Sequence, residues 1–207
     1  YLTKKTGEEF PEKLTITFDK VQDLRYGENP HQKAAFYKGM KPQYSLANAK
    51  QLHGKELSYN NIQDGNAAIE ILKEFEGQHA AVGLKHMNPC GIGLGNSIDE
   101  AWDKCFEADP VSIFGGIVAF NDEVNETTAE KLSKIFLEII IAPGFDDDAY
   151  AVLAKKKNIR LLKVDFSAKD EPTRHEVVSV MGGVLMQEPD TLKEDWHDWE
   201  CVPDVKP

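Results

Sequence analysis

A pair of basic residues, Lys85 and His86, follows a short apolar run and could carry out acid–base chemistry. A histidine titrates near neutral pH and can accept a proton, and a lysine supplies a positive charge. Residues 80–84 are typical of a buried strand, and the Asn-Pro-Cys-Gly of residues 88–91 predicts a turn. Because ligands of open α/β sheets bind beyond the carboxyl ends of strands, this strand would carry the pair to a binding site. A strand end with two solvated cations is an equal alternative on spacing alone.

Alternating strands and helices are predicted to position this pair. Strands are expected at residues 13–18, 35–37, 79–85, 117–120, 139–142 and 159–164, and helices at 61–75, 97–106, 127–137 and 146–156. Residues 21–34 are expected to form an irregular loop, and residues 177–186 two extended segments joined at Gly182 and Gly183. The order of elements predicts the α/β class, with a layered mixed sheet and flanking helices.

Composition limits the partners of the chain. Its 207 residues are 41% hydrophobic and carry a formal net charge of -11, which argues against nucleic acid or an anionic membrane as the main partner. No apolar run approaches the roughly 20 residues that cross a bilayer. The odd number of cysteines, without metal-ligand spacing, favours reduced thiols in a cytoplasmic protein. The chain opens without Met, which predicts a piece of a longer protein.

Four ordered segments together resemble one family. They are residues 23–32 (DLRYGENPHQ), 54–61 (GKELSYNN) with Asp64, 85–91 (KHMNPCG), and 113–116 (IFGG) followed by 139–144 (IIIAPG). They are similar to the family in which 5-aminoimidazole-4-carboxamide ribonucleotide (AICAR) formyltransferase is fused to inosine monophosphate (IMP) cyclohydrolase. Each segment alone is weak, but the ordered set is specific.

The resemblance implies a reaction and a fold. The reaction is formyl transfer from 10-formyltetrahydrofolate, a co-substrate, to the amine of AICAR, a late step of purine (IMP) synthesis. The implied fold is cytidine-deaminase-like without zinc. Zinc-dependent deaminases carry the motifs His-x-Glu and Pro-Cys-x-x-Cys. Here Pro89-Cys90 is followed by Gly93 at the position of the second cysteine, and no His-x-Glu lies upstream, so the zinc site is incomplete. The glycine-rich residues 91–95 lack a full dinucleotide fingerprint. A nucleoside deaminase, which a zinc analysis would test, is a further alternative.

The family's catalytic residues match Lys85 and His86. His86 would remove a proton from the attacking amine, and Lys85 would orient the substrate and offset developing negative charge. Neighbouring strand residues point to opposite faces, so the two can act on one ligand only if the strand ends or twists there. A structural histidine at a strand end is the alternative for His86.

Two further positions match the family's nucleotide contacts. Arg25 resembles the arginine that binds the ribonucleotide phosphate, and Tyr26 offers a ring and a hydroxyl beside it. A solvated loop arginine is the alternative for Arg25. Asn61 is a candidate nucleotide contact, with helix capping as an equal alternative.

The remaining matches surround the pocket in which nucleotide and pterin meet. Phe114 and Gly115 resemble residues that line it, and Gly115 would let a ligand approach the backbone closely. Glu138 aligns with an acidic nucleotide-binding position, in the role of a ribose contact. It precedes the predicted strand at 139–142, which is awkward for a site at strand carboxyl ends, so a solvated acid is an equal alternative.

The resemblance also sets the expected domains. Residues 1–187 match the first lobe of the formyltransferase region, with a first strand and nucleotide-binding loop in residues 1–36. Residues 188–207 form an acidic segment that would lead to a missing second lobe, and the cyclohydrolase domain is also absent. Family active sites lie at a homodimer interface, so this chain alone is expected to be weakly active or inactive. A non-catalytic nucleotide-binding or dimerisation fragment is the alternative.

Overall fold

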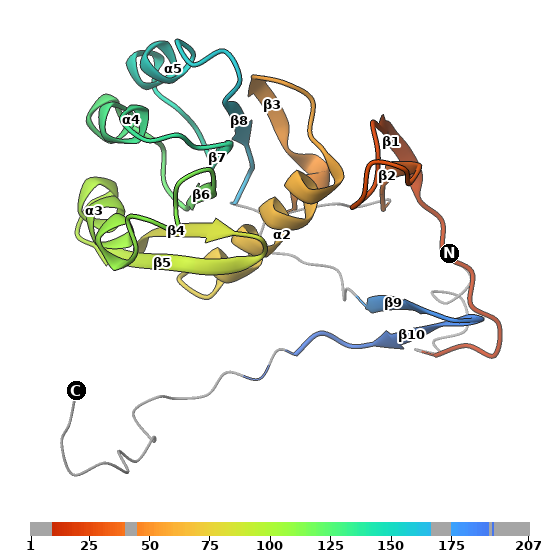
Figure 1. The fold of residues 1–207 in the computed structure, drawn as a ribbon. Helices are drawn as coiled ribbons and strands as arrows, with labels where there is room; N and C mark the ends of the chain where they lie inside the picture. The colour runs from red at the N-terminus through yellow and green to blue at the C-terminus, as the bar shows by residue number, and fades with distance from the viewer. Residues whose placement is uncertain (1–9, 40–44, 167–174, 191, 193–207) are drawn as a thin grey trace. The chain divides into compact units, whose positions relative to one another are not determined.

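The computed structural model describes residues 10–39, 45–166, 175–190 and 192, which fall into two units dividing between residues 169 and 170. The first unit holds a six-stranded sheet and its helices, and the second holds a two-stranded hairpin (Figure 1). No helix among the described residues is both long enough and apolar enough to cross a membrane.

The six-stranded sheet is mixed, with the strand order β3-β8-β7-β6-β4-β5. Its strands are β3 (Lys50–His53), β4 (His79–Lys85), β5 (Asn88–Gly95), β6 (Ile117–Phe120), β7 (Ile139–Ala142) and β8 (Arg160–Lys163). The strands β6, β7 and β8 are parallel, whereas β4 is antiparallel to both of its neighbours. The carboxyl end of β4 therefore meets the amino ends of β6, β7 and β8, and we call this end of the sheet the Lys85 end.

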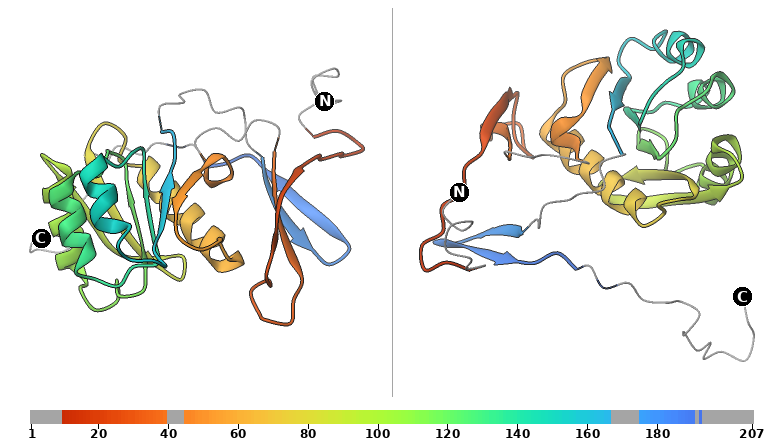
Figure 2. Two further views of the ribbon diagram at one scale, coloured as in Figure 1. Left: turned by 90° about the horizontal axis from the view of Figure 1, so that it is seen from above. Right: turned by 180° about the vertical axis from the view of Figure 1, so that it is seen from behind.

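Four α-helices cover the two faces of the sheet (Figure 2). They are α2 (Tyr59–Lys73), α3 (Ile98–Ala108), α4 (Glu126–Ser133) and α5 (Asp147–Leu153), and a short 3-10 helix, η1, spans Leu46–Asn48. Side chains alternate between faces, so Ile139 and Ile141 of β7 pack in the cluster with α2, and Ile140 packs with the other three helices. This arrangement confirms an α/β fold with a mixed sheet between flanking helices.

Most of the elements expected around this sheet are confirmed, with end points that shift by a few residues. The β4 strand occupies residues 79–85 as expected. The helix predicted from Ser97 is α3, whose cap is the Ser97 hydroxyl accepting the Glu100 N–H at 3.3 Å. The pattern gave no sign of β3, an outer strand of four residues with one apolar side chain, Leu52.

The strand predicted at residues 13–18 is wrong. Leu14, Ile16 and Phe18 are exposed, and the first strand is β1 (Asp19–Leu24), which pairs with β2 (Ala34–Lys38) in an antiparallel hairpin. The loop expected from residue 21 therefore begins later, and the short strand at 35–37 is confirmed. Alternation alone does not make a strand, because the backbone also needs a partner to bond with.

The turn predicted at residues 88–91 is also wrong. The chain turns at His86 and Met87, and β5 runs from Asn88 through Pro89 to Gly95, paired with β4. Proline is accommodated because β5 is an outer strand and its pairing with β4 shifts register beside Pro89.

The alternating glycines of β5 let the helix α3 lie directly against the strand. A Cβ atom on Gly93 would lie 2.0 Å from the carbonyl oxygen of Ala101, and one on Gly91 would lie 2.0 Å from that of Cys105. Both distances are far below van der Waals contact. The glycine-rich run therefore serves helix packing in this fold.

The second unit is an antiparallel hairpin of β9 (Glu176–Val180) and β10 (Gly183–Gln187). This confirms the two extended segments, although the turn residues are Met181 and Gly182, the latter with a φ of 80°. Most of the acidic segment at 188–207 lies outside the described residues.

Candidate functional site

The two candidate catalytic residues lie at the end of β4 and in the turn that follows. Lys85 pairs with Asn88, so His86 and Met87 form a two-residue hairpin loop. Both have positive φ values, 53° and 62°, as in a type I′ turn. Because the strand ends at Lys85, the strict alternation of faces does not extend to His86, which is the condition under which both can serve one ligand.

Side chains from three elements hold this turn. The Met87 N–H donates to Oδ1 of Asp64 on α2 at 2.9 Å, and Nδ2 of Asn88 donates to the His86 carbonyl at 2.8 Å. The ammonium of Lys85 donates to the Phe114 carbonyl at 2.9 Å. Non-glycine residues at positive φ persist only when their surroundings hold them, and these contacts supply that support.

The Phe114–Gly115 segment lies at the same end of the sheet. Gly115 has a φ of 74°, a conformation that favours glycine, and its N–H donates to the Phe136 carbonyl at 2.7 Å. The ring of Phe114 is 59% exposed and tilts against the Phe136 ring, with centroids 5.4 Å apart. An aromatic face is therefore presented to solvent beside Lys85.

Glu138 joins the Lys85 end because β4 is reversed. It precedes β7, and its N–H donates to the Gly116 carbonyl at 2.9 Å. The expected conflict with a site at strand carboxyl ends is removed, since the carboxyl end of β4 and the amino end of β7 coincide. The carboxylate Oε2 accepts from Nδ2 of Asn61 at 2.9 Å and lies 3.9 Å from a guanidinium nitrogen of Arg160. Burial lowers the pKa of Arg160, and the charge of Glu138 opposes this.

Asn61 caps the helix α2, which is the alternative to a nucleotide contact that the sequence left open. Its N–H donates to the Ser58 hydroxyl at 3.2 Å, and its Oδ1 accepts the Ser58 N–H at 3.1 Å. The same side chain is buried and also holds Glu138. Asp64, one helical turn further along, belongs to the same motif, but the resemblance assigns it no role. Its spacing of three residues from Asn61 places both on one helix face.

Arg25 and Tyr26 lie in the loop between β1 and β2. The guanidinium carbon is 5.7 Å from the centroid of the Tyr26 ring, and the Gly27 N–H donates to the Gln32 carbonyl at 2.8 Å across the loop. In the described parts of the chain, no hydrogen bond or ion pair joins Arg25 or Tyr26 to the Lys85 end. The structure thus brings together the other six candidates: Asn61, Lys85, His86, Phe114, Gly115 and Glu138.

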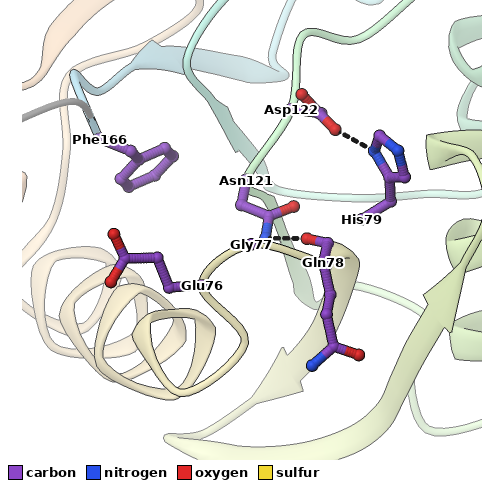
Figure 3. Close-up of a pocket in the computed structure, with 7 residues that line it drawn as sticks. All are labelled: Glu76, Gly77, Gln78, His79, Asn121, Asp122 and Phe166. Atoms are coloured by element: carbon purple, nitrogen blue, oxygen red, sulfur yellow. Dashed lines mark hydrogen bonds and ion pairs between the residues drawn. The ribbon is translucent and has the colours of Figure 1, made fainter.

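The opposite end of the sheet contains a hollow of about 260 Å³ (Figure 3). It is lined by Glu76, Gly77, Gln78, His79, Asn121, Asp122 and Phe166. Polar groups here bond to one another: the Asn121 side chain accepts the Ala80 N–H at 2.8 Å and donates to the Gln78 carbonyl at 2.6 Å, and His79 contacts Asp122. These bonds join the segment before β4 to the segment after β6.

The described residues contain no group of three or more histidine, cysteine, aspartate or glutamate side chains placed to hold a metal ion. Among the described residues, Cys90 is partly buried and Cys105 is buried, and both are free thiols.

Cys105 is expected to resist alkylation while the chain is folded. Burial raises the pKa of its thiol to about 12, so the reactive thiolate at pH 8 is a fraction of about 10⁻⁴. Mass spectrometry after iodoacetamide treatment should find Cys105 unmodified in buffer and modified in guanidinium. Modification of Cys105 in buffer at the rate of an unfolded control would contradict this packing.

Known proteins are similar to this chain over nearly its whole length. The chain matches the family described as "AICARFT/IMPCHase bienzyme" over residues 1–207. It is 62% identical over 208 residues to the bifunctional purine biosynthesis protein PurH of Limosilactobacillus reuteri. The proteins of the same name from Lactobacillus acidophilus and Lysinibacillus sphaericus are 59% and 61% identical. These alignments cover 98–100% of this chain but 40% of each relative, so the chain spans less than half of their length.

Proposed function

The chain belongs to the AICARFT/IMPCHase bienzyme family, and from this premise we propose that it carries formyltransferase residues of a purine-biosynthesis enzyme. The reaction is formyl transfer from 10-formyltetrahydrofolate to AICAR, which gives formyl-AICAR and tetrahydrofolate. The observation that carries this proposal is the meeting of three distant segments, around Lys85, Phe114 and Glu138, at one end of the sheet. They are the segments in which the family resemblance lies.

The chemistry needs a base, because the amine of AICAR is a poor nucleophile. The amine nitrogen attacks the formyl carbon, and a C–N bond forms as the carbonyl oxygen becomes an oxyanion. His86, exposed in its turn, accepts the proton that the amine loses. Collapse of the tetrahedral intermediate then breaks the bond to N10 of the folate, which takes up a proton as it leaves.

Lys85 has a geometry that fits stabilisation of the oxyanion. Its ammonium has three N–H donors, and one of them is used on the Phe114 carbonyl. That bond fixes the position of the charge and leaves donors for the substrate. A fixed positive charge beside the reacting carbon lowers the energy of the developing negative charge.

The remaining candidates would bind the nucleotide. Arg25 and Tyr26 would take the phosphate and the base, and Phe114 with Gly115 would line the region where nucleotide and pterin meet. Among the described residues, both side-chain contacts of Glu138 involve Oε2, so Oε1 is left to accept from a ribose hydroxyl. In this proposal Asn61 orients Glu138 and lies beside the nucleotide.

The wider assignment follows from the same premise. Residues 1–187 would be the first lobe of the formyltransferase region, and residues 188–207 would lead toward its second lobe. The Lys85 end is open to solvent, as the exposure of Phe114 illustrates, and a second subunit of a cytoplasmic homodimer would cover it. The chain by itself would then be weakly active or inactive.

Calorimetry with AICAR tests the assignment of the nucleotide site. Replacing Arg25 by alanine is expected to weaken binding by about 10- to 100-fold, the usual effect of losing a charge-assisted hydrogen bond. Lys38→Ala, which removes an exposed positive charge from the same hairpin, is the control and should leave the affinity within about twofold. Equal losses in both variants would contradict a specific phosphate contact at Arg25.

A further inference from the structure

The His86–Met87 turn is built from residues that do not favour its backbone. Two-residue turns with both φ values positive are usually formed by asparagine and glycine, whereas a histidine and a methionine occupy these positions here. The Met87 side chain is 51% exposed, so packing of that side chain supplies little of the support. The backbone of the turn must be held by hydrogen bonds.

Asp64 supplies the bond that reaches the turn from another element. Its Oδ1 accepts the Met87 N–H at 2.9 Å across the gap between α2 and the β4–β5 hairpin. Asn88 also bonds to the turn but belongs to the hairpin itself and moves with it. The Lys85–Phe114 bond holds the end of β4, and Asp64 is the contact that joins the turn residues themselves to the rest of the site.

The helix that carries Asp64 is itself well fixed. Its first turn is capped reciprocally by Ser58 and Asn61, and Asn61 bonds to Glu138. The next residue, Gly65, is buried against Leu46 and Ile141, where an added Cβ would lie 3.2 Å from Leu46. A side chain on such a support can hold a reacting group to within the small tolerance that catalysis requires.

The Asp64 carboxyl is partly buried where it accepts the Met87 N–H, so it has lost part of its contact with water. Burial raises the pKa of its carboxyl, while the Met87 N–H and the charge of His86 act in the opposite direction. The carboxylate is therefore partly dehydrated, and the Met87 N–H replaces part of its hydration.

We propose that Asp64 is a positioning residue that holds His86 in the left-handed turn from which it takes the proton of the amine. The inference rests on the proposed function of His86. Loss of the bond would let the turn relax toward ordinary φ values and move the imidazole away from the reacting nitrogen. Misplacement by about 1 Å costs up to about 100-fold in rate, with little effect on substrate binding.

The test uses the longest natural protein that contains this sequence. Asp64→Ala should lower kcat for formyl transfer by about 10- to 100-fold, with the KM for AICAR within about threefold. Asp64→Asn keeps an oxygen that can accept the Met87 N–H and should retain most of kcat. Glu70→Ala, which removes an exposed acid from the same helix, is the matched control and should leave both constants unchanged.

A second-site variant makes the test specific to the turn. Glycine adopts positive φ without strain. The double variant Asp64→Ala/Met87→Gly should therefore have a kcat at least tenfold higher than that of Asp64→Ala alone. A failure of Met87→Gly to rescue, or a loss in Asp64→Asn as large as in Asp64→Ala, would overturn the proposal, since charge or helix stability would then be the cause.

A readout without activity separates this inference from the proposed function. In this chain the Met87 amide should exchange slowly with solvent, and Asp64→Ala should accelerate its exchange at least tenfold while Glu70→Ala does not. Unchanged exchange in Asp64→Ala would overturn the role of Asp64 alone. Accelerated exchange in Asp64→Ala, together with a parent full-length protein that transfers no formyl group, would instead overturn the function assigned to His86.

Discussion

Replacing His86 by alanine is expected to reduce the rate of formyl transfer by about 10²- to 10⁴-fold, the usual range for loss of a general base. The imidazole lies at the end of β4, where Lys85, Phe114 and Glu138 also meet. The measurement is kcat for formyl-AICAR formation by the longest natural protein containing this sequence. The KM for AICAR should change little, because the proposed phosphate and ribose contacts are made by other residues, Arg25 and Glu138.

Another histidine of the same strand provides the control. His79 begins β4 at the opposite end of the sheet, where it contacts Asp122, and His79→Ala should keep kcat within about twofold. A comparable loss of rate in both variants would indicate general damage to the strand. A His86→Ala protein with undiminished kcat would show that the base lies elsewhere.

The Gly93→Ala substitution is expected to lower the free energy of unfolding by about 3 kcal/mol, at the upper part of the range for overpacking. The added Cβ would lie 2.0 Å from the Ala101 carbonyl oxygen and 2.5 Å from the Cys105 nitrogen, both in the backbone of α3. A helix backbone cannot yield as a flexible side chain can, so α3 must move away from β5. Urea denaturation should show a lower midpoint with an unchanged slope.

Gly39→Ala provides the control for the cost of the methyl group itself. Among the described residues, its Cβ would meet one side-chain atom, on Phe18, at an ordinary contact distance of 3.9 Å. The midpoint of Gly39→Ala should stay close to that of the parent chain. Equal midpoints for the two variants would mean that β5 and α3 do not pack as described.

The parts of the fold that the sequence predicted correctly are those with local causes. The buried strand at residues 139–142 is apolar throughout, and the start of α3 is marked by Ser97 and Glu100 within four residues of each other. The errors concern pairing. Residues 13–18 alternate like a strand but pair with no strand in the described part of the chain, and β5 runs through Pro89 because an outer strand tolerates proline.

The candidate site could be predicted only in part, for a related reason. The types of Lys85, His86 and Glu138 were visible in the sequence, but their meeting at one end of the sheet depends on the reversed direction of β4. A parallel β4 would have separated them by the length of a strand. The role of Asp64 was also hidden, because its contact with the Met87 N–H spans 23 residues of sequence.

The two-residue loop between β4 and β5 also limits how the length of the chain could change in evolution. Inserting or deleting one residue there would exchange the two faces of β5 relative to β4. Ile92 and Leu94 would then point toward α3 in place of the glycines, whose positions leave no room for a single carbon atom. Homologues that keep α3 against β5 are therefore expected to keep this loop at one length, while their surface loops vary freely.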